Sequence, residues 1–252
     1  MKTKKIIIAL FACLLLFSAC QPQTENNPEQ PASKSSAPQL KEGTTIADIA
    51  EPRTRGVADM KGDNSDTIGW LSIPDTYVDD VVVQGADNQF YFRRNFDKEN
   101  DFYGVYFADY RADFKNELDD LPTNTVIYGH AITDNPESEK YDVRFSSLHN
   151  FRDEEYVKNH PYIFFSTDKS DHVFEVMAVF ITNSNNPDFP YNNPALSSDD
   201  FVKMVEKDIL PRSIWNYKDV SFDKDDKFIT LSTCIYELED GTSTNYPKTW
   251  YR

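Results

Sequence analysis

Short runs of β-branched and aromatic residues, separated by turn-forming residues, constrain the fold of this chain more than any other feature. They lie within 64–74, 79–85, 104–108, 124–128, 162–167, 172–181 and 228–234. Such runs predict β-strands, and their spacing favours a closed or nearly closed β-barrel. The polar residues Asp168–Asp171 separate two of the runs and predict a β-hairpin there.

Helical patterns lie between these runs, at 45–61, 88–94, 141–158 and 197–210. Ser197 or Ser198 can cap the last of them, and Pro211 is expected to stop it. The predicted fold class is therefore mainly β with flanking helices: a closed barrel with an N-terminal helix and a helix between the late strands.

The first residues predict an export signal. A lysine-rich start precedes the apolar run Ile6–Phe17, which is shorter than the roughly 20 residues that a membrane-spanning helix needs. We expect residues 1–19 to be a signal peptide. The small residues before Cys20 resemble a bacterial lipobox, which predicts cleavage and lipidation at Cys20; cleavage at an ordinary small-residue site, or an uncleaved anchor, are the alternatives.

A tether and one compact domain follow the signal. Residues 20–45 are polar and contain several prolines, so they are expected to be a disordered tether, and 46–252 are expected to form one folded domain. The net charge of −16 argues against nucleic acid as a partner, because an acidic surface repels phosphates.

Cys234 and His130 are the candidate catalytic residues. Each ends a predicted strand, and Cys13 and Cys20 fall in the export signal, so the domain carries a single thiol. A thiol becomes a good nucleophile when a nearby imidazole favours its thiolate, although a buried structural cysteine is the alternative. No histidine or cysteine pair has metal-ligand spacing, so neither a metal nor another cofactor is expected.

Several motifs together resemble the sortase family. Thr230–Cys234 matches the Thr-Leu-x-Thr-Cys signature of that family, and Tyr128–His130 matches its histidine segment. Asp66–Pro74, Val82–Asn88 and Tyr91 resemble class B sortases in order and spacing. The resemblance extends from about residue 59 to Cys234.

The resemblance implies a membrane-associated cysteine transpeptidase of a Gram-positive bacterium, facing the cell wall. Cys234 would attack a C-terminal sorting motif of a surface protein or pilin, and His130 would act as acid and base. A peptidoglycan or pilin amine would then accept the acyl group. A hydrolytic thiol peptidase and an inactive peptide-binding lipoprotein are the alternatives.

Further site residues follow from the same resemblance. Arg252 takes the role of the family's oxyanion-stabilising arginine because no other arginine follows Cys234, and Ser232 and Thr233 are expected to line the substrate groove. Asp109 and Arg111 fit the family pattern and are interpreted as structural.

The sequence departs from the pattern of the family in two features near its C-terminal end. The interval from Cys234 to Arg252 is longer than in the family, which predicts an inserted loop across 239–248. Members of the family continue into a final strand after this arginine, whereas the present sequence stops at Arg252. We therefore expect an unpaired barrel edge and a weakly active or unstable protein.

Overall fold

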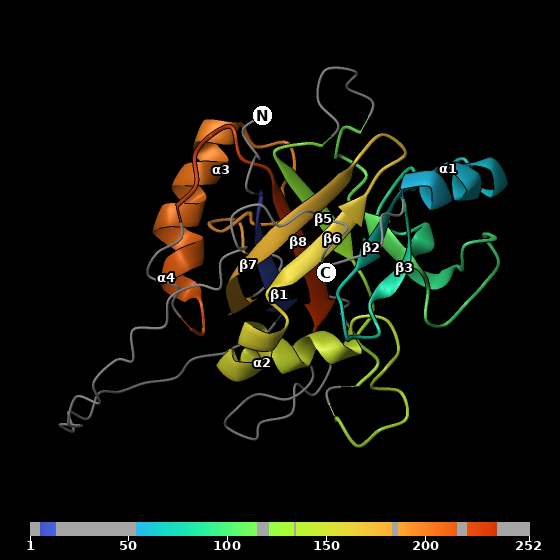
Figure 1. Ribbon diagram of the computed structural model, residues 1–252, viewed down its shortest axis with the longest axis horizontal. Helices are drawn as coiled ribbons and strands as arrows, with labels where there is room; N and C mark the ends of the chain where they lie inside the picture. The colour runs from blue at the N-terminus through green and yellow to red at the C-terminus, as the bar shows by residue number, and fades with distance from the viewer. Residues whose placement is uncertain are drawn as a thin grey trace.

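In the computed structural model the barrel is closed. The structure describes residues 54–114, 121–133, 135–182, 186–215 and 221–235, together with the backbone of 6–13. Within these residues the strand order is β1-β7-β6-β2-β3-β4-β5-β8 (Figure 1). The strands are β1 (Ile6–Cys13), β2 (Thr67–Ser72), β3 (Asp79–Val83), β4 (Tyr106–Ala108), β5 (Asn124–Tyr128), β6 (Tyr162–Ser166), β7 (Asp171–Thr182) and β8 (Phe228–Cys234).

Short helices surround the barrel. Figure 1 shows α1 on one side of the barrel, α3 and α4 on the opposite side, and α2 near one end. The helices and helical turns are α1 (Thr54–Asp63), η2 (Tyr91–Arg93), η3 (Ser146–Arg152), α2 (Glu154–Asn159), α3 (Ser198–Met204), η4 (Val205–Ile209) and α4 (Leu210–Arg212). The mainly β barrel with flanking helices, which the sequence predicted, is confirmed.

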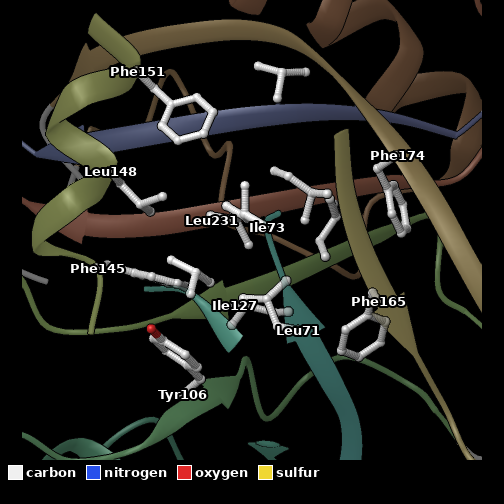
Figure 2. Packing of buried hydrophobic residues seen from close by; sticks show 14 of the residues in the cluster. Leu71, Ile73, Tyr106, Ile127, Phe145, Leu148, Phe151, Phe165, Phe174 and Leu231 are labelled. Atoms are coloured by element: carbon white, nitrogen blue, oxygen red, sulfur yellow. The ribbon is translucent and has the colours of Figure 1, made fainter. Parts of the chain in front are cut away.

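The barrel interior is the main hydrophobic core, and it fixes which face of each strand points outward. Ile127 of β5 and Leu231 of β8 are neighbours in register and belong to this core (Figure 2). Because successive side chains of a strand point to opposite faces, the residues on either side of Ile127 and Leu231 point out of the barrel.

A second hydrophobic cluster attaches α3 and η4 to the outside of the barrel. It includes residues of β7, of the 186–196 segment, of the helices and of β8: Met177, Phe180, Phe189, Tyr191, Phe201, Val205 and Phe228. The helix between the late strands therefore covers an apolar barrel face that water would otherwise contact.

The hairpin and the cap of α3 agree with the sequence prediction. β6 and β7 pair antiparallel through a turn after Ser166, and the Ser197 side chain accepts a hydrogen bond from the backbone N–H of Asp200. Pro211, however, does not end the helix. It lies in the first turn of α4, where no intrahelical N–H is required, after the π-helical turn η4.

Three predicted helices differ in extent or type. The 141–158 pattern divides into the 3₁₀ helix η3 and the α-helix α2, because Asp153 takes an extended conformation and caps α2 by accepting from Glu155 N. The 88–94 pattern gives only the 3₁₀ turn η2. The first predicted helix is described from Thr54 and continues to Asp63, and its expected beginning at residue 45 lies outside the described residues.

β1 occupies the position beside β8 where the sequence predicted an open edge. Ile6–Cys13 pairs parallel with both β7 and β8, and Cys13 is in register with Cys234. A run rich in isoleucine suits a strand as well as an export signal. β8 therefore has a neighbour on both sides in the 252-residue chain, whereas removal of residues 1–19 as a signal peptide stays a prediction.

Candidate active site

Cys234 ends β8 and is partly exposed. The strand is almost completely buried before it, from Phe228 to Thr233. This rigid, buried strand fixes the backbone of Cys234, while the end of the strand brings the thiol to the surface of the barrel. The placement suits a nucleophile, because reactive thiols need access as well as a defined position.

The register between β5 and β8 brings His130 to the same place. The two strands run parallel, and Tyr128 is in register with Ser232. Two contacts continue the pairing beyond the strands: Gly129 N donates to Ser232 O (3.2 Å), and Thr233 Oγ1 donates to Gly129 O (2.9 Å). Continuing this register by two residues aligns His130 with Cys234.

Both side chains belong to the outer face of the barrel. Ile127 and Leu231 point into the core, so the alternation assigns Tyr128, His130, Ser232 and Cys234 to the opposite face. Side chains at matching positions of adjacent parallel strands project to the same side of the sheet. The register and this alternation are thus consistent with a site that contains both residues that the sequence indicated as catalytic.

His130 is held against the 3₁₀ turn η2. Its Nε2 lies 2.7 Å from the carbonyl oxygen of Phe92, and its ring packs at 4.3 Å from the Phe92 ring. Because a carbonyl oxygen only accepts hydrogen bonds, Nε2 carries the hydrogen. In the neutral imidazole the lone pair is then on Nδ1, which is the nitrogen able to take or return a proton.

Burial, and after it the positive charges of Arg93 and Arg144, lower the pKa of His130 to about 4 against the opposing effect of the hydrogen bond to Phe92. The imidazole is therefore neutral at pH 7. Arg144 is fixed nearby by an ion pair with Asp80, with Nη1 and Oδ2 2.6 Å apart, and by packing over the Tyr106 ring.

A close approach of Phe145 fixes the backbone between Tyr128 and His130. A Cβ added at Gly129 would lie 2.5 Å from the Phe145 ring, which is too close for any side chain. Phe145 is fully buried, stacks on Tyr106 at 4.4 Å, and its N–H donates to His130 O at 2.8 Å. The histidine is thus held through its backbone as well as its ring.

A buried carboxylate supports the strand that carries His130. Asp109 is completely buried and accepts two hydrogen bonds of 2.8 Å from the Arg111 guanidinium, one from Arg111 N (3.0 Å), one from Tyr128 Oη (2.9 Å) and one from Asn88 (2.9 Å). Burial disfavours the charged form, but the bonds from Arg111 and Asn88 outweigh it and hold the pKa of Asp109 below its usual value. This network is consistent with the structural role expected for Asp109 and Arg111.

Ser232 and Thr233 lie on β8 directly before the cysteine. Each is nearly buried, and each hydroxyl has an internal partner: Tyr191 Oη lies 3.3 Å from Ser232 Oγ, and Thr233 Oγ1 donates to Gly129. These contacts order the end of β8. Contact of Ser232 or Thr233 with a substrate stays a prediction.

Known proteins with the same organisation are sortases. Sortase B of Listeria monocytogenes is 30% identical over 182 residues, which cover 72% of this chain and 68% of the relative. The chain belongs to the sortase B family. The structure of Clostridium perfringens sortase B matches with a TM-score of 0.62 and 25% identity, over 72% of this chain and 92% of that one.

A Staphylococcus aureus sortase B–substrate complex matches with a TM-score of 0.62 and 24% identity, over 77% of this chain and 82% of that one. No protein-family model matches the chain. Membership of the sortase B family makes the protein a cysteine transpeptidase, as the sequence motifs predicted.

Two predicted site residues, Arg252 and Cys20, lie outside the described residues, as does the loop expected across 239–248. Within the described part of the chain, no helix is long and apolar enough to cross a bilayer. No cluster of three or more histidine, cysteine and acidic side chains there is arranged to hold a metal ion.

Sequence reasoning missed the contribution of Phe92 and Arg144. Phe92 acts through a backbone carbonyl, which no side-chain pattern reveals. Arg144 has a positive φ of 54°, and it reaches the vicinity of His130 through a bridge between Ala131 and its own backbone. Only the fold brings these groups together.

Proposed function

We propose that this sortase cleaves a C-terminal sorting motif with Cys234 as nucleophile and His130 as acid and base, and transfers the protein to an amine. The acceptor is a peptidoglycan peptide or a pilin lysine. The parallel register of β5 and β8, which aligns His130 with Cys234 when it is continued by two residues, supports this proposal.

The reaction follows from the chemistry of the pair. Cys234 Sγ attacks the carbonyl carbon of the motif after its proton passes to His130 Nδ1. The peptide bond breaks, His130 returns the proton to the departing amine, and a thioester to Cys234 remains. A primary amine then attacks the thioester, His130 takes up its proton, and an amide forms as the thiol is restored.

Oxyanion stabilisation is assigned to Arg252 by the resemblance to other sortases. A guanidinium near the attacked carbonyl would favour the negative charge that develops on its oxygen. Ser232 and Thr233 are proposed to border the substrate chain, since they precede the nucleophile on the same strand.

The proposed location is the outer face of the plasma membrane. The apolar run Ile6–Phe17 and the small residues before Cys20 support export and a lipid anchor, with the polar segment 20–45 as a tether. Mass spectrometry of the membrane-bound protein tests this proposal, since an unmodified Cys20 in the membrane fraction would contradict it.

A peptide-transfer assay tests the enzymatic proposal. The full-length chain is incubated with a library of sorting-motif peptides, with and without hydroxylamine as the amine acceptor, and the products are identified by mass. We expect hydroxamate product when the amine is present, and loss of all turnover in Cys234→Ala and His130→Ala.

Matched controls decide between the outcomes. His172→Ala removes a partly exposed imidazole from β7 and should leave turnover unchanged. Hydrolysis alone, even with excess amine, would indicate a thiol peptidase. Turnover that survives Cys234→Ala would contradict the proposal altogether.

A further inference from the structure

The turn that holds His130 is itself part of a small, closely bonded hairpin. Residues 93–101 fold back so that Arg94 and Asn100 form a bridge, Asp101 N donates to Arg93 O (3.0 Å), and Asn95 N donates to Glu99 O (3.0 Å). The hairpin ties η2 to the residues that lead into β4. The position of the Phe92 carbonyl, and with it His130, therefore depends on residues distant from the histidine in sequence.

Gly104 is the point where the residues after this hairpin contact the carbonyl groups of η2. Its φ is +61°, a left-handed conformation that strongly favours glycine. A Cβ at this position would lie 3.0 Å from both Tyr91 O and Phe92 O. Glycine is thus required twice, once by its backbone angle and once by the approach of two carbonyl oxygens.

The Phe92 carbonyl lies between two groups that leave it little freedom. His130 Nε2 contacts its oxygen at 2.7 Å, and a Cβ on residue 104 would press against the same oxygen. Any side chain at residue 104 must move the carbonyl by a few tenths of an ångström or more. The hydrogen bond that orients the imidazole would then lengthen or bend.

We propose that Gly104 and the Phe92 carbonyl together are a positioning device for catalysis: Gly104 allows the carbonyl to reach His130 Nε2, and the carbonyl keeps the hydrogen on Nε2 and the lone pair on Nδ1. This inference rests on the proposed role of His130 as acid and base. Gly104 itself touches no reacting atom and acts through the turn. The benefit is a histidine that is oriented and in the useful tautomer before substrate binds.

The test is Gly104→Ala in the full-length chain, with activity and tautomer measured separately. We expect kcat to fall by about tenfold to a hundredfold with KM changed less than about twofold, since a misplaced proton-transfer group affects the chemical step and not peptide binding. Nitrogen-15 NMR of the His130 ring should show loss of the pure Nε2–H tautomer, a signal that a merely structural role would not change.

Two further variants separate positioning from strain. Gly104→Asn also adds a Cβ, but asparagine tolerates the left-handed conformation better than alanine. We expect it to lose the tautomer and kcat like alanine, although its thermal stability is closer to that of wild type. Gly62→Ala is the matched control, because a Cβ there meets nothing within 4 Å, and both readouts should stay at wild-type values.

The outcomes distinguish this inference from the proposed function. A wild-type tautomer and kcat in folded Gly104→Ala would overturn the positioning role, and so would recovery of both in Gly104→Asn. Full activity of His130→Ala would instead refute the catalytic role of the histidine, whatever the tautomer result for Gly104.

Discussion

The carboxylate of Asp109 offers the sharpest test of how the barrel supports its active site. Asp109→Asn preserves the shape of the side chain but removes its charge. Five hydrogen bonds converge on this carboxylate, three of them from Arg111 and the others from Tyr128 and Asn88. An amide has one NH₂ group in place of a carboxylate oxygen, so it cannot accept all five.

The expected loss in the free energy of unfolding follows from this geometry. Removing one partner of a buried ion pair costs about 3–5 kcal/mol when the other charge stays buried. The Arg111 side chain, however, is 36% exposed, so water partly solvates the guanidinium that loses its partner. We therefore expect a loss of about 2–3 kcal/mol, close to that of removing a hydrogen bond to a charged group.

The stability deficit of Asp109→Asn should depend on pH in a defined direction. The pKa of Asp109 is lower in the folded protein than in the unfolded chain, so its stabilisation is present above the unfolded pKa of about 4 and is lost as the pH falls through the folded pKa. Urea denaturation from pH 8 to pH 3 should show a constant deficit for Asp109→Asn near neutrality. The deficit should shrink below about pH 4, as the pH approaches the range where the wild-type carboxylate also becomes neutral.

Asp188→Asn is the control, because Asp188 is exposed; its stability should match that of the wild type at every pH. A deficit of less than about 1 kcal/mol for Asp109→Asn at pH 7, or a deficit that grows as the pH falls, would refute this reasoning.

Three other substitutions or deletions test separate parts of the structure. Phe145→Ala should lower the free energy of unfolding by about 3–5 kcal/mol, since the ring is fully buried against Tyr106; a loss below about 1 kcal/mol in urea denaturation would contradict this packing. Arg144→Gln should raise the pKa of His130 above its value of about 4, because a nearby positive charge is removed; an NMR titration with an unchanged or lower pKa would be inconsistent with it. Deleting residues 1–19, as the proposed processing before Cys20 also would, removes β1 and leaves the edges of β7 and β8 without this partner, so the Tm should fall and self-association should increase relative to the unprocessed chain; an unchanged Tm and a monomer would contradict it.

The strands were predictable because their signals are local. β5 and β8 are short β-branched runs that lead directly into chemically distinctive residues, and this is why the sequence alone indicates His130 and Cys234. The pairing of these strands is not local. Only the parallel register, continued beyond Tyr128 and Ser232, aligns the two residues.

The helical regions were harder to predict because weak periodicity does not separate an α-helix from a 3₁₀ helix. The 141–158 pattern has apolar positions that fit either, and the break comes from the extended backbone of Asp153. The proline at 211 was interpreted as a stop, although the first turn of a helix tolerates it.

The groups that surround His130 carry almost no sequence signal. The Phe92 carbonyl would be present with any residue at that position, and the need for glycine at 104 depends on a backbone angle and on carbonyl oxygens from another segment. Tertiary contacts of this kind become visible only when the chain is folded.

Trapping the covalent intermediate tests the central claim most directly. The full-length chain is mixed with a sorting-motif peptide in the absence of any amine, quenched in acid, and digested for peptide mapping by mass spectrometry. The account predicts one acyl group on Cys234, absent from Cys234→Ala, strongly reduced in His130→Ala, and discharged when hydroxylamine is added before the quench. An acyl group on another residue, or turnover without any adduct in the folded wild-type protein, would contradict it.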